Sequence, residues 1–166
     1  SGTAGNGGAG GDDGAGAEAQ AADAGAGERV PTFAEVLGLV GDRLHFDLEV
    51  KQPGIEAGVL EVLAAYPAVR WAISSFDWAI LQRVRVLAPG AELWPLAMHV
   101  NQALLDVAAV LGSPCVAIDA GAYTAASARA LSDAGLAAMV WTVNQPDEAL
   151  RVRALGAAAL CTDVPR

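Results

Sequence analysis

The sequence predicts an α/β protein with a parallel β-sheet, on three observations. Short runs of apolar and β-branched residues alternate with longer segments of helical periodicity. Residues that commonly begin or end helices stand at the joins between these segments. A hydrophobic content of 54% in 166 residues is enough to bury one compact core. Periodicity alone leaves two architectures open, a doubly wound sheet and a barrel.

The elements follow one another in regular alternation. A potential capping box at Thr32 and Glu35 predicts a first helix that ends near Val40. After it, the predicted strands are 44–50, 69–75, 92–97, 115–119, 137–143 and 158–162, and the predicted helices are 55–65, 77–87, 101–111, 124–134 and 146–155.

Specific residue types support the predicted boundaries of several helices. Asp77 is expected to cap the helix that follows it, and Asn144 the helix that has Pro146 in its first turn. Gly135 and Gly156 come just after helical runs, where a residue in the left-handed conformation commonly ends a helix. These assignments agree with repeated βα units.

Residues 1–28 differ in composition from the rest of the chain. They hold ten of the nineteen glycines and no aromatic residue, lysine or arginine. Such a segment buries too little apolar area to offset the entropy lost on ordering, so we expect a disordered, acidic linker. The predicted domain is residues 29–166.

Charge and hydropathy exclude some classes of function. The net charge of -9 argues against a nucleic-acid partner, because nucleic-acid binders carry basic patches. No run of about 20 apolar residues predicts a membrane span, and no signal peptide is visible. A cytoplasmic location is favoured on this basis, with the compartment otherwise open. Cys115 and Cys161 are expected to be buried free thiols rather than a disulfide.

The segment 44–51, LHFDLEVK, carries the clearest chemistry. Alternation along a strand places Asp47, Glu49 and Lys51 on one face, and we expect His45 on the other face with Leu48. One interpretation is that Glu49 binds a hard cation while Lys51 meets a phosphate. The other is that the strand emerges into solvent with Glu49 and Lys51 as a surface ion pair. The residue types alone do not decide between them.

Several segments, in order, resemble the glycerophosphodiester phosphodiesterase family. They are 26–37, the FDLEVK run at 46–51, the SSFD run at 74–77, the WTVN run at 141–144 and the closing LG and TD pairs between 155 and 163. The resemblance covers about residues 25–166. It implies a TIM-type (β/α) barrel that hydrolyses glycerophosphodiesters to an alcohol and glycerol 3-phosphate with a divalent metal, Mg²⁺ or Ca²⁺.

The resemblance also implies roles for residues of this chain. Glu49 matches the metal ligand of the family, and Lys51, Phe76 and Trp141 match substrate-binding positions. The family's HRG, ENT, E-x-D and HD motifs, which hold its catalytic histidines, are not found in these residues. We therefore expect an incomplete barrel that lacks the first strands, is inactive as an isolated chain, and exposes an apolar interior and two open edges through which it self-associates.

Each of these roles has a plainer alternative. Trp141 and Phe76 are also typical core aromatics, with core packing favoured for Phe76. Ser75 is expected to support the cap at Asp77 rather than bind a ligand, and His99 to be a surface or core residue. At the level of the whole chain, the alternatives are a non-catalytic α/β remnant that binds a partner and another phosphate-handling barrel.

Overall fold

The computed structural model describes residues 29–165, so the linker predicted for residues 1–28 lies outside the described residues. The chain divides into a first unit, Ser1–Thr32, and a second unit, Phe33–Arg166. All the helices and strands described below belong to the second unit.

Helices and strands alternate along the second unit. In chain order the elements are α1 (Phe33–Val40), β1 (His45–Glu49), α2 (Glu56–Ala64), β2 (Arg70–Ser75), α3 (Trp78–Leu87), β3 (Glu92–Ala97), α4 (Gln102–Leu111), β4 (Cys115–Asp119), a 3₁₀ turn η1 (Ala120–Ala122), α5 (Ala125–Asp133), β5 (Ala137–Trp141), α6 (Pro146–Ala154) and β6 (Ala159–Leu160). Every predicted helix and strand is thus confirmed. β6 is shorter than predicted because its backbone pairing with β5 ends after Cys161.

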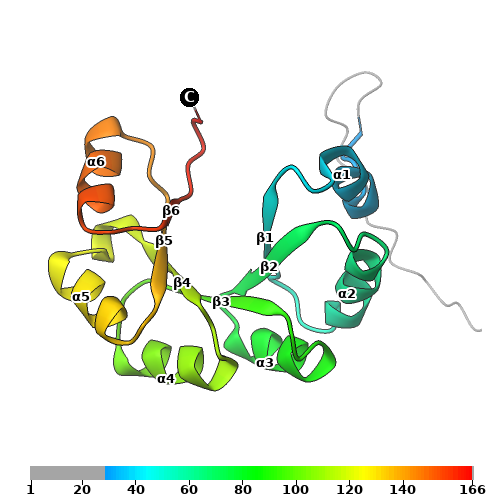
Figure 1. Cartoon of the computed structure of the whole chain (residues 1–166), viewed down its shortest axis with the longest axis horizontal. Helices are drawn as coiled ribbons and strands as arrows, with labels where there is room; N and C mark the ends of the chain where they lie inside the picture. Colours follow the sequence, from blue (N-terminus) through cyan, green and yellow to red (C-terminus); the bar gives the residue numbers. More distant parts are fainter. Residues whose placement is uncertain (1–28, 166) are drawn as a thin grey trace, which may run out of the picture. The chain divides into compact units, whose positions relative to one another are not determined.

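The strands form one parallel sheet in the order β1-β2-β3-β4-β5-β6. Figure 1 shows this sheet curled, with the helices on its outer side and β1 and β6 at its two ends. A doubly wound sheet would reverse its strand order at a switch point and carry helices on both faces. The sequential order therefore decides for the barrel, and the fold is part of a TIM-type (β/α) barrel, incomplete in the described residues.

The core has two layers because side chains alternate along each strand. The larger layer lies between sheet and helices and includes Ile73, Leu93 and Ile118, each with 0% exposure. The smaller layer lies on the inner face and consists of Leu96, Cys115, Ala117 and Met139, with Trp94 and Trp141 packed against it.

The inner layer differs from the expectation of an exposed apolar interior. Its four members are at most 6% exposed, and the two tryptophan side chains pack against them. In the described part of the chain, the most exposed large apolar side chains lie on the helices, such as Val86 of α3 (80%), and Phe76 (49%) and Leu160 (39%) are exposed near the ends of strands.

Two of the predicted caps have different outcomes. Asp77 caps α3 as predicted, since its Oδ1 accepts a hydrogen bond from the backbone N–H of Ala79 at 3.0 Å. Asn144 does not cap α6; the cap position is Gln145, whose side chain makes no capping bond. Asn144 instead turns toward the end of β6, as described below. Gly135 and Gly156 have positive φ, as expected of residues that end helices.

The cysteine prediction is right in one respect and wrong in another. Both thiols are free, but only Cys115 is buried, whereas Cys161 is exposed at the end of the short strand β6. Among the described residues, no helix has the length and apolarity that crossing a membrane requires.

Candidate functional site at the carboxyl ends of the strands

The face of β1 that points away from the helices carries polar side chains. His45, Asp47 and Glu49 are the more exposed residues of the strand, while Phe46 and Leu48 pack against the core. The prediction that His45 lies on the face opposite Asp47 and Glu49 is wrong, because residues two and four apart in a strand share a face. His45 lies at the amino-terminal end of β1, the end away from the loops that follow the strands.

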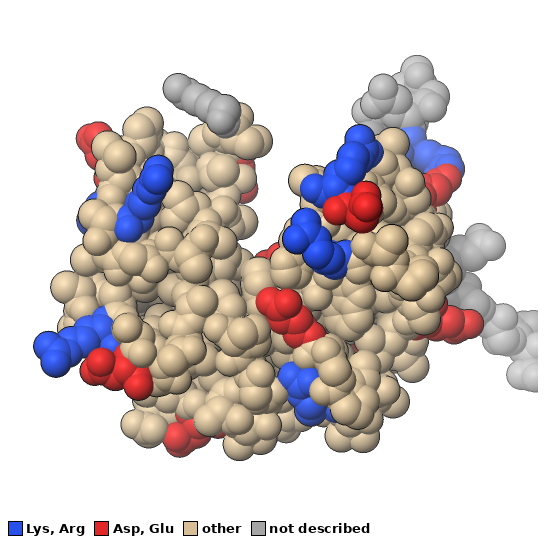
Figure 2. Space-filling model, in the orientation of Figure 1, with Lys and Arg blue, Asp and Glu red and all other residues tan. Residues whose placement is uncertain are grey.

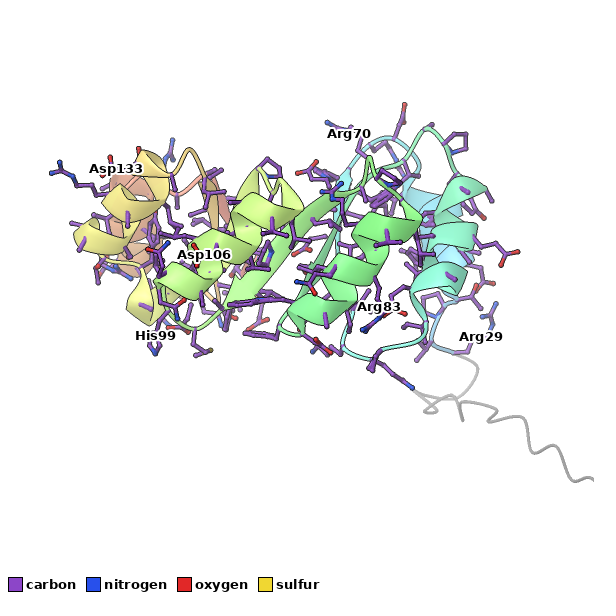
Figure 3. The ribbon with its side chains drawn as sticks, turned by 90° about the horizontal axis from the view of Figure 1, so that it is seen from below. Arg29, Arg70, Arg83, His99, Asp106 and Asp133 are labelled. Carbon is purple, nitrogen blue, oxygen red and sulfur yellow. The ribbon has the colours of Figure 1, made fainter. Side chains whose placement is uncertain are left out.

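The surroundings of His45 confirm that it belongs to the other end of the sheet. Its Nε2 lies 3.9 Å from Oε2 of Glu92, and its ring meets the ring of Trp94 edge-on with centroids 5.7 Å apart. Figure 3 shows the two ends of the second unit, with Arg70 at the amino-terminal end of β2 and His99, which follows β3, at the opposite end.

Glu49 and Lys51 form an ion pair where β1 ends. Nζ of Lys51 lies 3.3 Å from Oε2 of Glu49, and the side chains are 78% and 36% exposed respectively. A pair this open to solvent contributes at most about 1 kcal/mol to folding. Both groups are accessible to a ligand, so the surface-pair interpretation and the binding interpretation describe the same geometry.

Asp47 lies two residues before Glu49 on the same face of β1, and the pKa of its carboxyl group is raised. Burial raises the pKa of the Asp47 carboxyl, the nearby hydroxyl of Ser74 and His45 oppose that rise, and the charge of Glu49 adds to it. A cationic group beside the Asp47 carboxylate would favour its charged form.

An aromatic pair stands at the same edge of the sheet. The rings of Phe76, in the loop after β2, and Trp141, the last residue of β5, meet edge-on with centroids 5.5 Å apart and an interplanar angle of 85°. Phe76 is half exposed, so the favoured expectation that it is a core residue is wrong. Trp141 is partly buried and packs on the inner layer.

Ser75 and Asp77 hold the loop that carries Phe76. Oγ of Ser75 donates to the carbonyl of Val50 at 2.7 Å and accepts from the backbone N–H of Asp77 at 3.1 Å. Ser75 thus supports the helix cap, as predicted, and also ties the loop after β2 to the end of β1. Phe76 and Lys51 are carried by loops that are joined in this way.

The two ends of the curled sheet, β1 and β6, lie on opposite sides of its open inner face (Figure 1). Although Cys161 is exposed, the partial loss of water around its thiol raises the pKa, and the negative charges of Asp163, Asp47 and Glu49 raise it further. Cys161 follows β6 and the two last carboxylates belong to β1, so groups from both ends of the curled sheet contribute to the raised pKa. Figure 2 shows this side of the unit hollowed between the part that carries β1 and the part that carries β5 and β6.

A polar cluster that was not predicted from the sequence lies beyond β5 and β6. Oδ1 of Asn144 accepts from the backbone N–H of Asp163 at 2.9 Å and from Oγ1 of Thr162 at 3.1 Å, while its Nδ2 donates to Oδ2 of Asp163 at 3.0 Å. The WTVN and TD segments contain all three residues, so the signal was present in the sequence; the pairing of the two segments was not.

His99 stays apart from these residues. It is exposed in the loop after β3 and lines a cavity of about 550 Å³ together with Asp119, at the end of β4, and Thr124, just before α5. Within residues 29–165, no group of three or more His, Cys, Asp and Glu side chains is arranged to hold a metal ion.

A curled parallel sheet with polar and aromatic side chains at the carboxyl ends of its strands is the arrangement of TIM-barrel enzymes, whose active sites lie at that edge. The comparison with protein families identifies the particular class. Residues 12–166 match the model of the glycerophosphoryl diester phosphodiesterase family. The chain belongs to this family.

Solved structures agree with this assignment. A structure from Silicibacter pomeroyi DSS-3, named for glycerophosphoryl diester phosphodiesterase, superposes with a TM-score of 0.74 at 26% identity over 82% of this chain and 54% of its own. An Oleispira antarctica phosphodiesterase in complex with the product sn-glycerol-3-phosphate also gives 0.74, at 22% identity over 82% of this chain and 59% of its own. One from Galdieria sulphuraria, named for glycerophosphodiester phosphodiesterase, gives 0.74 at 18% identity over 85% and 63% respectively.

The chain therefore spans between 54% and 63% of the length of these three relatives. No curated protein matches the sequence. At identities below 25% the likeness to the second and third structures shows the fold alone.

Proposed function

We propose that this chain supplies the carboxyl-terminal part of the active site of an enzyme that hydrolyses glycerophosphodiesters to an alcohol and glycerol 3-phosphate. The family match over residues 12–166 carries the proposal. It is supported by the placement of Glu49, Lys51, Phe76 and Trp141 at the carboxyl ends of β1, β2 and β5.

Lys51 is the phosphate-binding residue in this proposal. It is the only lysine in the sequence, and its ammonium group is exposed at the end of β1. The ammonium group of Lys51 can exchange its contact with Glu49 for a contact with a phosphoryl oxygen and remain accessible to water. As negative charge develops on the phosphoryl oxygens during hydrolysis, an ammonium group in contact with them lowers the barrier.

Glu49 is proposed as one ligand of a divalent metal, Mg²⁺ or Ca²⁺. Both ions prefer oxygen ligands, and each takes six or more, part of them from water. The residues from 29 to 165 offer no group of three such ligands, so they do not hold the ion by themselves. The other protein ligands would come from outside these residues.

Phe76 and Trp141 are proposed to contact the glycerol part of the substrate. Phe76 leaves half its surface accessible, and a ring face is a suitable partner for the C–H groups of a small polyol. The Oleispira antarctica relative was solved with sn-glycerol-3-phosphate, which is the product expected here and the natural probe for this chain.

The described residues offer no pair of histidines for general acid–base catalysis. His45 stands at the amino-terminal end of β1 and His99 in a separate loop after β3. Proton transfer to and from the oxygens being displaced would need groups from elsewhere. We therefore propose that the isolated chain binds the product weakly and does not hydrolyse the diester.

The test is a titration of the full chain with sn-glycerol 3-phosphate, followed by NMR, with Mg²⁺ present and absent. We expect weak binding that Lys51→Ala and Trp141→Ala each reduce, and a Mg²⁺ effect that Glu49→Gln removes. Glu61→Gln, an exposed carboxylate of α2, is the matched control. Binding that is unchanged in Lys51→Ala contradicts the proposal, and release of choline from glycerophosphocholine contradicts the proposed inactivity.

A second candidate, a non-catalytic module that binds a partner, rests on the sheet edges. In the described residues β1 pairs only with β2 and β6 only with β5, so each leaves one edge without a neighbouring strand. Sedimentation of the chain over a range of concentrations tests this candidate. A stable stoichiometric assembly without ligand binding favours the module, whereas a monomer that binds sn-glycerol 3-phosphate favours the enzyme fragment.

A further inference from the structure

The carboxamide of Asn144 joins the end of β5 to the end of β6. Beyond Cys161 the two strands no longer pair through backbone ladders, and the last such bonds run from Cys161 N–H to Val140 O at 2.9 Å and from Val143 N–H to Cys161 O at 2.8 Å. From there the Asn144 side chain continues the connection to Thr162 and Asp163. We call these three residues the Asn144 clamp.

The clamp needs a carboxamide. Its oxygen accepts from a backbone N–H and a hydroxyl, and its nitrogen donates to a carboxylate. An aspartate at this position has no donor and would place a second negative charge against Asp163, and an alanine has neither group. A further hydrogen bond, from Val164 N–H beside the clamp to Oγ1 of Thr162 at 3.2 Å, holds the hydroxyl that donates to Asn144.

The clamp lies close in sequence to the aromatic pair. Trp141 ends β5, three residues before Asn144, and is paired on one side with Asp119 of β4. On the other side β6 is only two residues long and ends at Leu160, so the ladder does not reach the level of Trp141. The backbone that follows Trp141 is therefore held on that side by the Val143–Cys161 bond and the clamp.

We propose that Asn144 is a positioning residue that holds Trp141 against Phe76, and thereby keeps the aromatic pair in the place where glycerol 3-phosphate binds. The binding part of this inference rests on the proposed function. The positioning part rests on the hydrogen bonds of Asn144 and on the edge-on contact of the two rings at 5.5 Å. Asn144 itself has no contact with substrate in this proposal.

The test compares Asn144→Ala and Asn144→Asp with Asn101→Ala. Asn101 caps α4 by accepting from Leu104 N–H at 2.9 Å, so its loss destabilises the fold without touching the clamp. The readout is the indole N–H resonance of Trp141 in an NMR spectrum, identified with Trp141→Phe. We expect both Asn144 variants to shift this resonance and Asn101→Ala to leave it in place.

Titration with sn-glycerol 3-phosphate gives the second readout. We expect a loss of affinity of at least about fivefold in the Asn144 variants, against no loss in Asn101→Ala. Lys51→Ala should weaken binding while the Trp141 resonance stays unshifted, which separates loss of a ligand contact from loss of position. If Asn144→Ala does not fold, Thr162→Val removes one bond of the clamp and should shift the resonance in the same direction by less.

An unshifted Trp141 resonance in Asn144→Asp and Thr162→Val overturns the positioning role, whatever happens to thermal stability. A wild-type chain that fails to bind sn-glycerol 3-phosphate overturns the proposed function instead, and the Trp141 resonance then still decides the positioning role.

Discussion

The loop after β1 that carries Lys51 is anchored by a buried carboxylate, and its removal should have an asymmetric effect. Oε1 of Glu56, at the start of α2, accepts from Nε of Arg83 on α3 at 2.7 Å, and its Oε2 accepts from the backbone N–H of Gly54 at 2.8 Å. The Glu56 side chain is 5% exposed and that of Arg83 44%. The carboxylate thus depends on its partner far more than the guanidinium does.

This difference sets the expected costs. Arg83→Met leaves a buried carboxylate without its cation, a change that costs about 3–5 kcal/mol in fully buried pairs. Because Arg83 is half exposed and the backbone hydrogen bonds of Glu56 are kept, we expect the unfolding free energy to fall by about 2 kcal/mol. Glu56→Gln leaves Arg83 to be solvated and weakens charged hydrogen bonds to neutral ones, for about 1 kcal/mol. In a domain of this size each kcal/mol lowers the melting temperature by roughly 3–5 °C.

The pH dependence has a definite sign. The hydrogen bond from its own backbone N–H and those from Arg83 and Gly54 lower the pKa of Glu56, against the effect of burial. A folded-state pKa below the unfolded value gives stability that is present above the unfolded pKa and is lost as the pH falls through the folded pKa. The difference in unfolding free energy between wild type and Arg83→Met should therefore shrink below about pH 4.

The assay is urea unfolding of wild type, Arg83→Met, Glu56→Gln and the double variant, followed by circular dichroism at pH 7 and at the lowest pH where the chain stays folded. The double variant should cost less than the sum of the single variants, because its neutral amide needs no cation. A Glu56→Gln cost equal to or above that of Arg83→Met would refute the reasoning, as would a cost of Arg83→Met that does not change with pH.

Three further predictions concern other parts of the chain. Burial raises the pKa of Cys115 to about 11. A thiol reagent at pH 8 should therefore label Cys161 alone in the native chain and Cys115 only after unfolding. Labelling of both at similar rates would contradict the burial of Cys115. The charge of Asp163 contributes to the raised pKa of Cys161, so Asp163→Asn should speed the labelling of Cys161. Added salt should speed it in the wild type, because salt screens this charge. An unchanged rate in both experiments would argue against the electrostatic cause. Asp77→Ala removes the cap of α3 and should lower the unfolding free energy by about 1 kcal/mol. Gln145→Ala, at a cap position without a side-chain hydrogen bond, should change it by less than about half of that. Equal costs would mean that the cap bond of Asp77 is not the cause.

The order and type of the elements could be predicted from the sequence, because the residue patterns that specify them are local. Alternating apolar runs, the cap at Asp77 and the glycines at 135 and 156 act within a few residues of their own position. The family segments also act in this way, since each is a strand followed by its own loop. For that reason the helices, the strands and the resemblance to a TIM-type enzyme were all predictable.

Which loops meet depends on how the strands assemble into the sheet, and this could not be predicted from the sequence. Two architectures were open to the sequence, and the strand order together with the single-sided helices chose the barrel. Asn144 has the residue type of a helix cap and the local spacing of one, but its partners lie on the next strand. A hydrogen bond between side chains 19 residues apart depends on how β6 lies beside β5, which no local pattern reports.

The same reason explains the outcomes at the aromatic residues and cysteines. Phe76 looked like a core residue, yet half of its surface stays accessible because the loop after β2 directs it toward Trp141 at the strand ends. Cys161 looked like a buried strand residue, yet it is exposed because β6 ends one residue earlier. Burial is a property of the assembled sheet. The sequence determined the residues available to the site, and the curl of the sheet decided which of them face each other.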